Sequence, residues 1–182
     1  MAALVIIGIV VLAALVFLLW WISASNSFKR RKIQVQESLS GIEVALTKRY
    51  DMLTKLLDTA RGYMAHEKDL FTQVIKLRRG MSVQEMSQAS EKMGELSTRL
   101  FAVAENYPQL RSAEVFVQLQ RGIHDAEDHL QAARRLYNAN VSAFNSSIAV
   151  FPGSLVANSQ GLAPMEFFVA EEHKRADVKM SF

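Results

Sequence analysis

Apolar and polar positions divide the chain into an uncharged first part and a charged remainder, and the first charged side chain is Lys29. From Leu4 to Ile22 almost every residue is Leu, Ile, Val, Ala, Phe or Trp. A helix rises about 1.5 Å per residue, so a helix over this run spans roughly the 30 Å hydrocarbon core of a bilayer. The pattern predicts that residues 1–28 form a transmembrane anchor.

The residues that follow the apolar run favour an anchor that is retained. Trp20 and Trp21 stand where aromatic side chains favour the membrane interface. A basic juxtamembrane segment, residues 29–32, comes next and consists of Lys29, Arg30, Arg31 and Lys32. The alternative is a signal peptide cleaved at residues 23–25, but such a peptide carries its basic residues before a shorter apolar run. The order found here therefore favours a single-pass anchor.

Charge indicates both the orientation and the partner of this anchor. Lys and Arg beside a span favour the cytoplasmic side, so we expect the N-terminus outside and the rest of the chain in the cytoplasm. The chain has 21 Lys and Arg against 18 Asp and Glu. Without the four basic residues of 29–32, the 17 that remain leave residues 33–182 with a net charge of −1. The positive charge thus belongs to the membrane boundary, which predicts the lipid bilayer as a partner and no nucleic-acid partner.

Beyond residue 32 the apolar residues recur at alternating intervals of three and four, which is typical of helices that pack against one another. Three such patterns cover about residues 33–79, 82–105 and 112–151. No stretch alternates with period two for long enough to predict a strand. The sequence therefore predicts an all-α fold: an N-terminal transmembrane helix followed by a long antiparallel (up-down-up) helical bundle over residues 33–153. Residues 154–182 are expected to form a loosely structured C-terminal tail.

Capping and turn residues mark the boundaries between the expected helices. Gly80 follows two arginines and suits the end of the first helix. Ser82 and Glu85 have the spacing of a capping box, which opens the second helix. Pro108 disfavours helical geometry in the residue before it and so ends the second helix, and Pro152 ends the third in the same way.

Residues suited to catalysis or metal binding are few. The chain has no Cys, and its densest acid–histidine cluster runs from His124 to His129. This cluster could begin the metal site of an enzyme, but a solvated helix face with intrahelical pairs is the better explanation. A di-iron bundle needs Glu three residues before His, which no His of this chain has. No nucleophile elbow and no Gly-rich phosphate loop occurs. We therefore assign no catalytic, metal or cofactor residue and expect neither a cofactor nor enzymatic activity.

The most unusual pattern is an aromatic residue at every seventh position, formed by Tyr137, Phe144 and Phe151. The residues that directly follow these three are Asn138, Asn145 and Pro152. Seven-residue spacing places the rings on one face of a helix. We expect a buried aromatic seam whose asparagines bond across helices and fix their register, with a partner-binding face as the alternative.

A larger set of residues carries a resemblance to a known family. Its second half comprises Ala104-Glu105-Asn106-Tyr107-Pro108, Phe116, Leu119-Gln120, Glu127, Arg134, Tyr137-Asn138, Val141, Phe144-Asn145, Ile148 and Phe151-Pro152. Its first half comprises Ile42, Val44, Leu46, Lys48-Arg49, Asp51-Met52-Leu53, Gly62-Tyr63 and Ala65-His66-Glu67. With these residues the chain resembles the LemA family of bacterial membrane proteins over nearly its whole length. It departs from the family at Thr54, where members usually have Pro nearby, so the first helix should lack a proline kink.

The resemblance implies a single-pass protein of the bacterial plasma (inner) membrane with a long helical-bundle domain, and it supplies no catalytic residue. From the residues themselves we predict a non-enzymatic, membrane-anchored helical scaffold or interaction protein. The alternative is a membrane-bound accessory that regulates an envelope enzyme, such as a protease or transporter, by binding it. In either case a protein partner, as yet unidentified, is expected.

Unequal helix lengths predict self-association. The expected middle helix is too short to cover both long ones, which leaves Leu39, Ile42 and Leu46 without a partner in the chain. Either the tail around Phe167 and Phe168 covers them or a second copy does. A shared membrane plane favours the second copy, so we expect a homo-oligomer.

Overall fold

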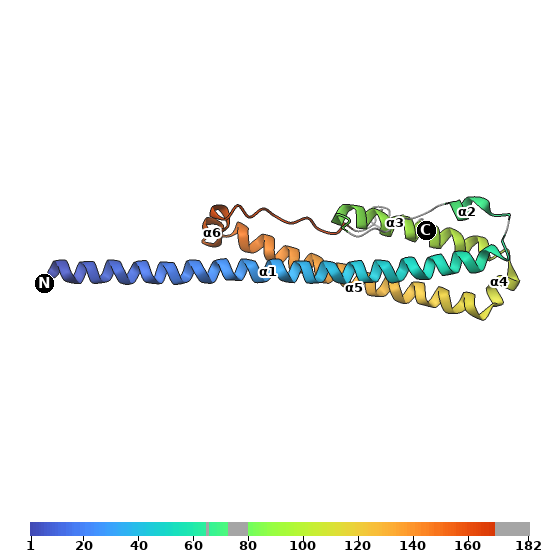
Figure 1. The fold of residues 1–182 in the computed structure, drawn as a ribbon, viewed down its shortest axis with the longest axis horizontal. Coiled ribbons are helices and arrows are strands. Elements are labelled where there is room, and N and C mark those ends of the chain that lie inside the picture. Colours follow the sequence, from blue (N-terminus) through green and yellow to red (C-terminus); the bar gives the residue numbers. More distant parts are fainter. Residues whose placement is uncertain (65, 73–79, 170–182) are drawn as a thin grey trace, which may run out of the picture. The chain divides into compact units, whose positions relative to one another are not determined.

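The computed structural model describes residues 1–64, 66–72 and 80–169, and all regular structure in these residues is helical. The elements are α1 Ala2–Arg61, α2 Lys68–Thr72, α3 Val83–Ala104, α4 Pro108–Ser112, α5 Glu114–Ala149 and α6 Gly153–Ser159 (Figure 1). The expected all-α fold, with a long apolar N-terminal helix followed by further helices, is confirmed. The chain divides into two compact units: unit 1 comprises residues 1–38 and 138–166, and unit 2 comprises residues 39–137 and those from 167 onward.

Helix α1 contains the apolar run and continues without a break to Arg61. The side chains from Leu4 to Leu19 are exposed, and α1 is the one helix in the described ranges that is long and apolar enough to cross a membrane. Residues 23–27 contain neither Pro nor Gly, so nothing in the sequence interrupts the helix after the apolar run. One helix therefore supplies both the apolar run and the first long helix of the packed part.

The first long helix ends earlier than the sequence predicted. The helix expected over residues 33–79 stops at Arg61, and the carbonyl of Ala60 accepts a 2.9 Å hydrogen bond from the backbone N–H of Tyr63. This tight turn closes the helix at Gly62, a residue of low helix propensity. The apolar pattern continues past the turn because the residues beyond it also pack into the core.

Helices α1 and α5 run antiparallel in unit 2. Gly41 of α1 faces Ala133 of α5, whereas Met52, farther along α1, faces Gly122, which comes earlier on α5. A Cβ atom at Gly122 would lie 3.2 Å from Met52 Sδ, so glycine allows a close approach of the two helices here.

Helices α3 and α5 are antiparallel as well, because Ser90 contacts Arg134 while Phe101 stacks on His124. Helix α3 consequently runs in the same direction as α1 (Figure 1), so the order is up-up-down and differs from the expected up-down-up. The two helices can run in the same direction because residues 62–82 separate the end of α1 from the start of α3, which is more chain than a tight reversing turn needs. Residues 73–79 of that expected helix lie outside the described residues.

Helix α3 begins where the sequence predicted. Ser82 Oγ accepts a 3.2 Å hydrogen bond from the backbone N–H of Glu85, and Glu85 Oε2 accepts a 2.8 Å bond from the N–H of Ser82. The capping box is therefore confirmed. Gly80, just before it, has φ +76°, a conformation that favours glycine. The helix ends at Ala104, and Pro108 opens the short helix α4.

The core of unit 2 buries one apolar face of each long helix. Its main members are Ile42, Leu46, Leu53, Leu56, Met86, Met93, Leu96, Leu100, Phe116, Ile123, Leu130 and Tyr137. Ile42 is 0 % exposed and Leu46 is 2 % exposed, so the expectation that these side chains lack a partner within the chain is wrong. Leu39 is half-buried. Helix α5 lies against this stretch of α1, since Gly41 faces Ala133.

Unit 1 packs residues 25–38 of α1 against the end of α5 and against α6. Its core consists of Phe28, Val35, Val141, Phe144, Ile148, Val156 and Ala157. Three hydrogen bonds join these elements: Arg31 Nη1 donates to Ala143 O (3.5 Å), Asn140 Nδ2 to Gln34 O (3.2 Å) and Gln160 Nε2 to Ser25 Oγ (2.6 Å). These bonds attach the last helical turns to the part of α1 that follows the apolar run.

We expected residues 154–182 to form a loosely structured tail, and this expectation is wrong for the first residues of that segment. Residues 153–159 form α6. After it, the side chain of Asn145 brackets the backbone of Met165: Oδ1 accepts from its N–H (2.8 Å) and Nδ2 donates to its carbonyl (2.9 Å). Phe168 is buried in unit 2. Residues 170–182 lie outside the described residues.

We expect Phe144→Ala to lower the free energy of unfolding by roughly 3 to 5 kcal/mol, because the lost transfer energy and the cavity add. Phe144 is 1 % exposed in the core of unit 1. Thermal unfolding of the full-length chain in mild detergent measures the loss. Leu136→Ala is the control, since Leu136 lies exposed on the same helix and its truncation should change the stability by no more than about 0.5 kcal/mol. Equal losses in the two variants would contradict the assignment of the core face.

Candidate functional site

Four polar side chains meet in the interior of unit 2. Arg49 comes from α1, Ser90 from α3, and Glu127 and Arg134 from α5. Arg49, Ser90 and Arg134 are buried, and Glu127 is half-buried. We call these four residues the buried polar cluster. Its hydrogen bonds and ion pair join the three long helices of unit 2.

The positions of the two arginines explain why they are buried. Arg49 lies three residues after Leu46 and four before Leu53, so it occupies a place on the apolar face of α1. Arg134 lies between the buried Leu130 and Tyr137 on α5 in the same way. Helical periodicity therefore directs both guanidinium groups toward the core, where a cation must be paired or hydrogen-bonded to be tolerated.

Arg49 forms the ionic centre of the cluster. Its Nη1 lies 2.7 Å from Glu127 Oε2, and it also donates to the carbonyl oxygen (3.2 Å) and the Oγ (3.3 Å) of Ser90. Glu127 Oε1 in turn accepts a 3.0 Å hydrogen bond from Gln131 Nε2. One cation thus contacts both α3 and α5, which fixes the positions of these helices along α1.

Arg134 links the cluster to the C-terminal part of the chain. Its Nη2 donates to Ser90 Oγ, so that hydroxyl oxygen accepts from both arginines. The guanidinium carbon lies 4.9 Å from the ring centre of Phe168, a cation–π geometry. Beside it, Ser87 Oγ donates a 3.0 Å hydrogen bond to the carbonyl of Val169. The cluster therefore also holds residues 168–169 against α3 and α5.

A groove of about 590 Å³ between α3 and α5 reaches the cluster from outside. Arg49 and Glu127 lie among its lining residues, together with Phe101 and His124, whose rings stack with their centres 6.0 Å apart. Within the described residues no group of three or more His, Cys, Asp or Glu side chains could hold a metal ion. In the cluster predicted from His124 to His129, Glu127 is instead paired with Arg49.

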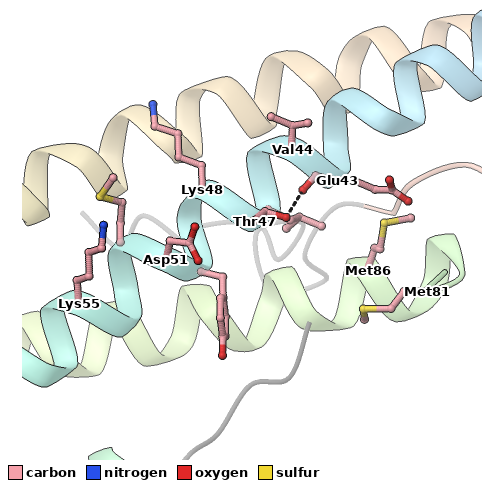
Figure 2. Close-up of a pocket in the computed structure, with 11 residues that line it drawn as sticks. Glu43, Val44, Thr47, Lys48, Asp51, Lys55, Met81 and Met86 are labelled. Carbon is pink, nitrogen blue, oxygen red and sulfur yellow. Dashed lines mark hydrogen bonds between the residues drawn. The ribbon is translucent and has the colours of Figure 1, made fainter. Parts of the chain in front are cut away.

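A second groove, of about 710 Å³, lies along α1 and the start of α3. Its lining residues are Glu43, Val44, Leu46, Thr47, Lys48, Tyr50, Asp51, Met52, Lys55, Met81 and Met86. Figure 2 shows Met81 and Met86 across from the α1 side chains, and Thr47 Oγ1 donating a 2.8 Å hydrogen bond to Glu43 O. Acidic and basic residues alternate along α1, and Val44 between them is exposed. Such a mixed surface suits contact with another polypeptide.

The structure separates the residues predicted for the aromatic seam. Tyr137 and Phe144 are buried as predicted, each in its own unit. Phe151 is 74 % exposed, and its neighbour Pro152 is exposed too, so their expected place in the core is wrong. Helix α5 ends at Ala149, so the seven-residue spacing no longer places residues beyond that point on the same helix face. Asn138 is half-buried.

Asn145 does make the specific contacts that its position suggested, but to a different partner. It bonds to the backbone of Met165 and not across to another helix. Among the expected membrane-boundary residues, Trp20 and Trp21 are half-buried, and Lys29, Arg30 and Lys32 are exposed. Arg31 is half-buried and bonded to Ala143.

Sequence reasoning missed the buried polar cluster, although one signal was present. Arg49 interrupts an otherwise apolar face, and a cation in such a position calls for an acidic partner on another helix. The sequence does not reveal that Glu127 is that partner, because the neighbouring acids Asp125 and Asp128 look equally available and only the packing of α5 selects among them.

We expect Glu127→Gln to destabilise the protein more than Arg49→Met. The first change leaves a cation whose side chain is 5 % exposed without this carboxylate, whereas the second leaves a carboxylate whose side chain is 22 % exposed and whose Oε1 keeps its hydrogen bond from Gln131. We expect the free energy of unfolding to fall by about 2 to 4 kcal/mol in Glu127→Gln and by about 1 to 2 kcal/mol in Arg49→Met. Urea unfolding in mild detergent measures both, with Lys48→Met as the exposed control at about 0.5 kcal/mol or less. The reverse order would show that Arg49 is not the more deeply desolvated partner.

Comparison with known proteins identifies the family of the chain. Residues 38–182 match the model of the LemA family. The chain is 27 % identical over 173 residues to Protein LemA of Metamycoplasma hominis, covering 91 % of this chain and 78 % of that protein. It is 21 % identical to Magnetosome protein MamQ of Magnetospirillum gryphiswaldense (89 % and 71 % covered) and 22 % identical to Magnetosome protein MamQ 2 of Paramagnetospirillum magneticum (87 % and 69 %). The resemblance inferred from the sequence is confirmed: the chain belongs to the LemA family.

Proposed function

We propose that this protein is a non-enzymatic, membrane-anchored helical scaffold that acts by binding proteins, including copies of itself. The observation that carries the proposal is helix α1. Its exposed apolar start has the length and composition of a membrane span, and the same helix continues into the packed core of unit 2. A continuous helix of this kind attaches a binding domain directly to a bilayer.

The character of the buried polar cluster supports binding over catalysis. Its two arginines are engaged with Ser90, Glu127 and Phe168, and these contacts hold helices together. The groove along α1 offers a mixed surface of methionines and charges, which is typical of adaptable protein contacts. The names of the relatives, Protein LemA and Magnetosome protein MamQ, specify no reaction.

The expected setting is the bacterial plasma membrane, with the N-terminus outside and the helical domain in the cytoplasm. A reporter fused after Phe182 should behave as cytoplasmic, because the basic residues of 29–32 directly follow the span. Paired green fluorescent protein and alkaline phosphatase fusions measure this. Strong phosphatase activity with a dark fluorescent fusion would contradict the orientation. Replacing all four basic residues with Asn should weaken the preference for the cytoplasmic side.

Self-association remains a prediction, although the reason first given for it does not hold, since Ile42 and Leu46 are covered within the chain. Anchoring supports it independently, because copies confined to one plane meet at a high effective concentration. When two copies with different tags are co-expressed, capture of one in mild detergent should recover the other, and an unrelated single-pass protein with the same tag should not be recovered. Recovery of a single copy at the mass of a monomer would contradict self-association. A second protein in stoichiometric amount would favour an accessory that regulates a partner.

A further inference from the structure

The turn between α5 and α6 in unit 1 exposes three large apolar side chains. Val150 is 63 % exposed, Phe151 is 74 % exposed and Leu155 is 53 % exposed. The core of unit 1 ends just before them at Ile148 and resumes just after them at Val156. We call residues 150–155 the α5–α6 turn. The three apolar side chains lie outside the core, and a group of exposed apolar side chains commonly marks a contact surface.

Contacts with α1 place this turn beside the end of the apolar run. Gln160 of the α6 end donates a 2.6 Å hydrogen bond to Ser25 Oγ. A Cβ atom at Gly153 would lie 3.4 Å from Phe28 Cζ, so the start of α6 lies directly on that ring. Figure 1 shows α6 alongside α1 in the same region. The turn is thus held against residues 25–28, which follow closely on Ile22.

The rise of the helix gives the depth of these contacts. Ser25 lies three residues beyond Ile22 and Phe28 six, which corresponds to about 5 and 9 Å along the helix. The headgroup layer extends roughly 5 to 8 Å beyond the hydrocarbon on each side of a bilayer. A span that ends near Ile22 therefore brings the α5–α6 turn to the level of the headgroups, where apolar and aromatic side chains of interfacial segments are buried.

The distribution of charge fits contact with lipid. No residue from Leu136 to Met165 carries a charge, so the turn can approach the bilayer without desolvating an ion. The exposed basic residues of unit 1 lie on the adjoining part of α1: Lys29, Arg30 and Lys32. Cations beside an apolar contact are the combination that attaches interfacial segments to anionic membranes.

We propose that the α5–α6 turn is a second membrane contact, in which Val150, Phe151 and Leu155 enter the interfacial layer of the leaflet from which α1 emerges. This inference rests on the proposed anchoring by α1. The protein is then attached to the membrane at two points: α1 crosses the bilayer, and the α5–α6 turn lies in the interfacial layer of the bilayer. The continuity of the turn with the apolar run favours lipid over a second protein copy as the group that covers it.

Single cysteines test the proposal cleanly, because the chain has none of its own. Phe151→Cys and Leu155→Cys, each in the full-length chain, are labelled with nitrobenzoxadiazole and reconstituted into vesicles that contain anionic lipid. Ile33→Cys is the matched control: Ile33 is also an exposed apolar residue of unit 1, but it lies about 16 Å of helical rise beyond Ile22. Val10→Cys reports whether α1 itself is inserted.

The labels at 151 and 155 should emit at shorter wavelength than the label at 33, be quenched severalfold less by aqueous iodide, and be quenched by lipids with a nitroxide near the top of the acyl chain. A label at 151 as open to iodide as that at 33, with the label at 10 in lipid, would overturn this inference alone. Shielding from iodide without nitroxide quenching would also overturn it, because a second copy would then cover the turn. A label at 10 that remains in water would overturn the proposed anchoring.

Discussion

The ion pair between Arg49 and Glu127 is the interaction on which the arrangement of unit 2 depends, because a cation in an apolar core must be compensated. The 2.7 Å contact joins α1 to α5, and the bonds from Arg49 to Ser90 join α1 to α3. Apolar faces alone tolerate sliding by a turn, whereas a buried cation has its partners at one register only. These contacts fix the positions of the three helices along one another, and Arg134 extends the same constraint to Phe168.

The same physical logic appears in unit 1 with neutral groups. Asn145 offers one acceptor and one donor, and both are used by the backbone of Met165. An extended backbone that lies on a helix has no ladder to satisfy its polar groups, so a side-chain amide that replaces a neighbouring strand holds it in place. The apolar α5–α6 turn is held beside residues 25–28 of α1 by further contacts within the same unit.

Parts of the candidate site could be predicted, and the limits have physical causes. The burial of Tyr137 and Phe144 follows from helical periodicity, which depends on local spacing alone. Phe151 shares the spacing, yet it is exposed because α5 ends two residues before it. A periodic pattern does not record where its helix stops. The pairing of Arg49 with Glu127 was not predicted either. Several acids of α5 lie within one turn of one another, and only the packing decides which of them faces α1.

The sequence by itself determined the features that arise between close neighbours in the chain: the apolar run from Leu4 to Ile22, the capping box of Ser82 and Glu85, and the all-helical content. Only the tertiary structure decided that α1 ends at Arg61 and that α3 runs parallel to it. Local preferences for continuing or ending a helix differ by about 1 kcal/mol or less per residue, and contacts between distant residues outweigh them. The apolar pattern of α3 is compatible with either direction of that helix, so the contacts of the packed core decide between them.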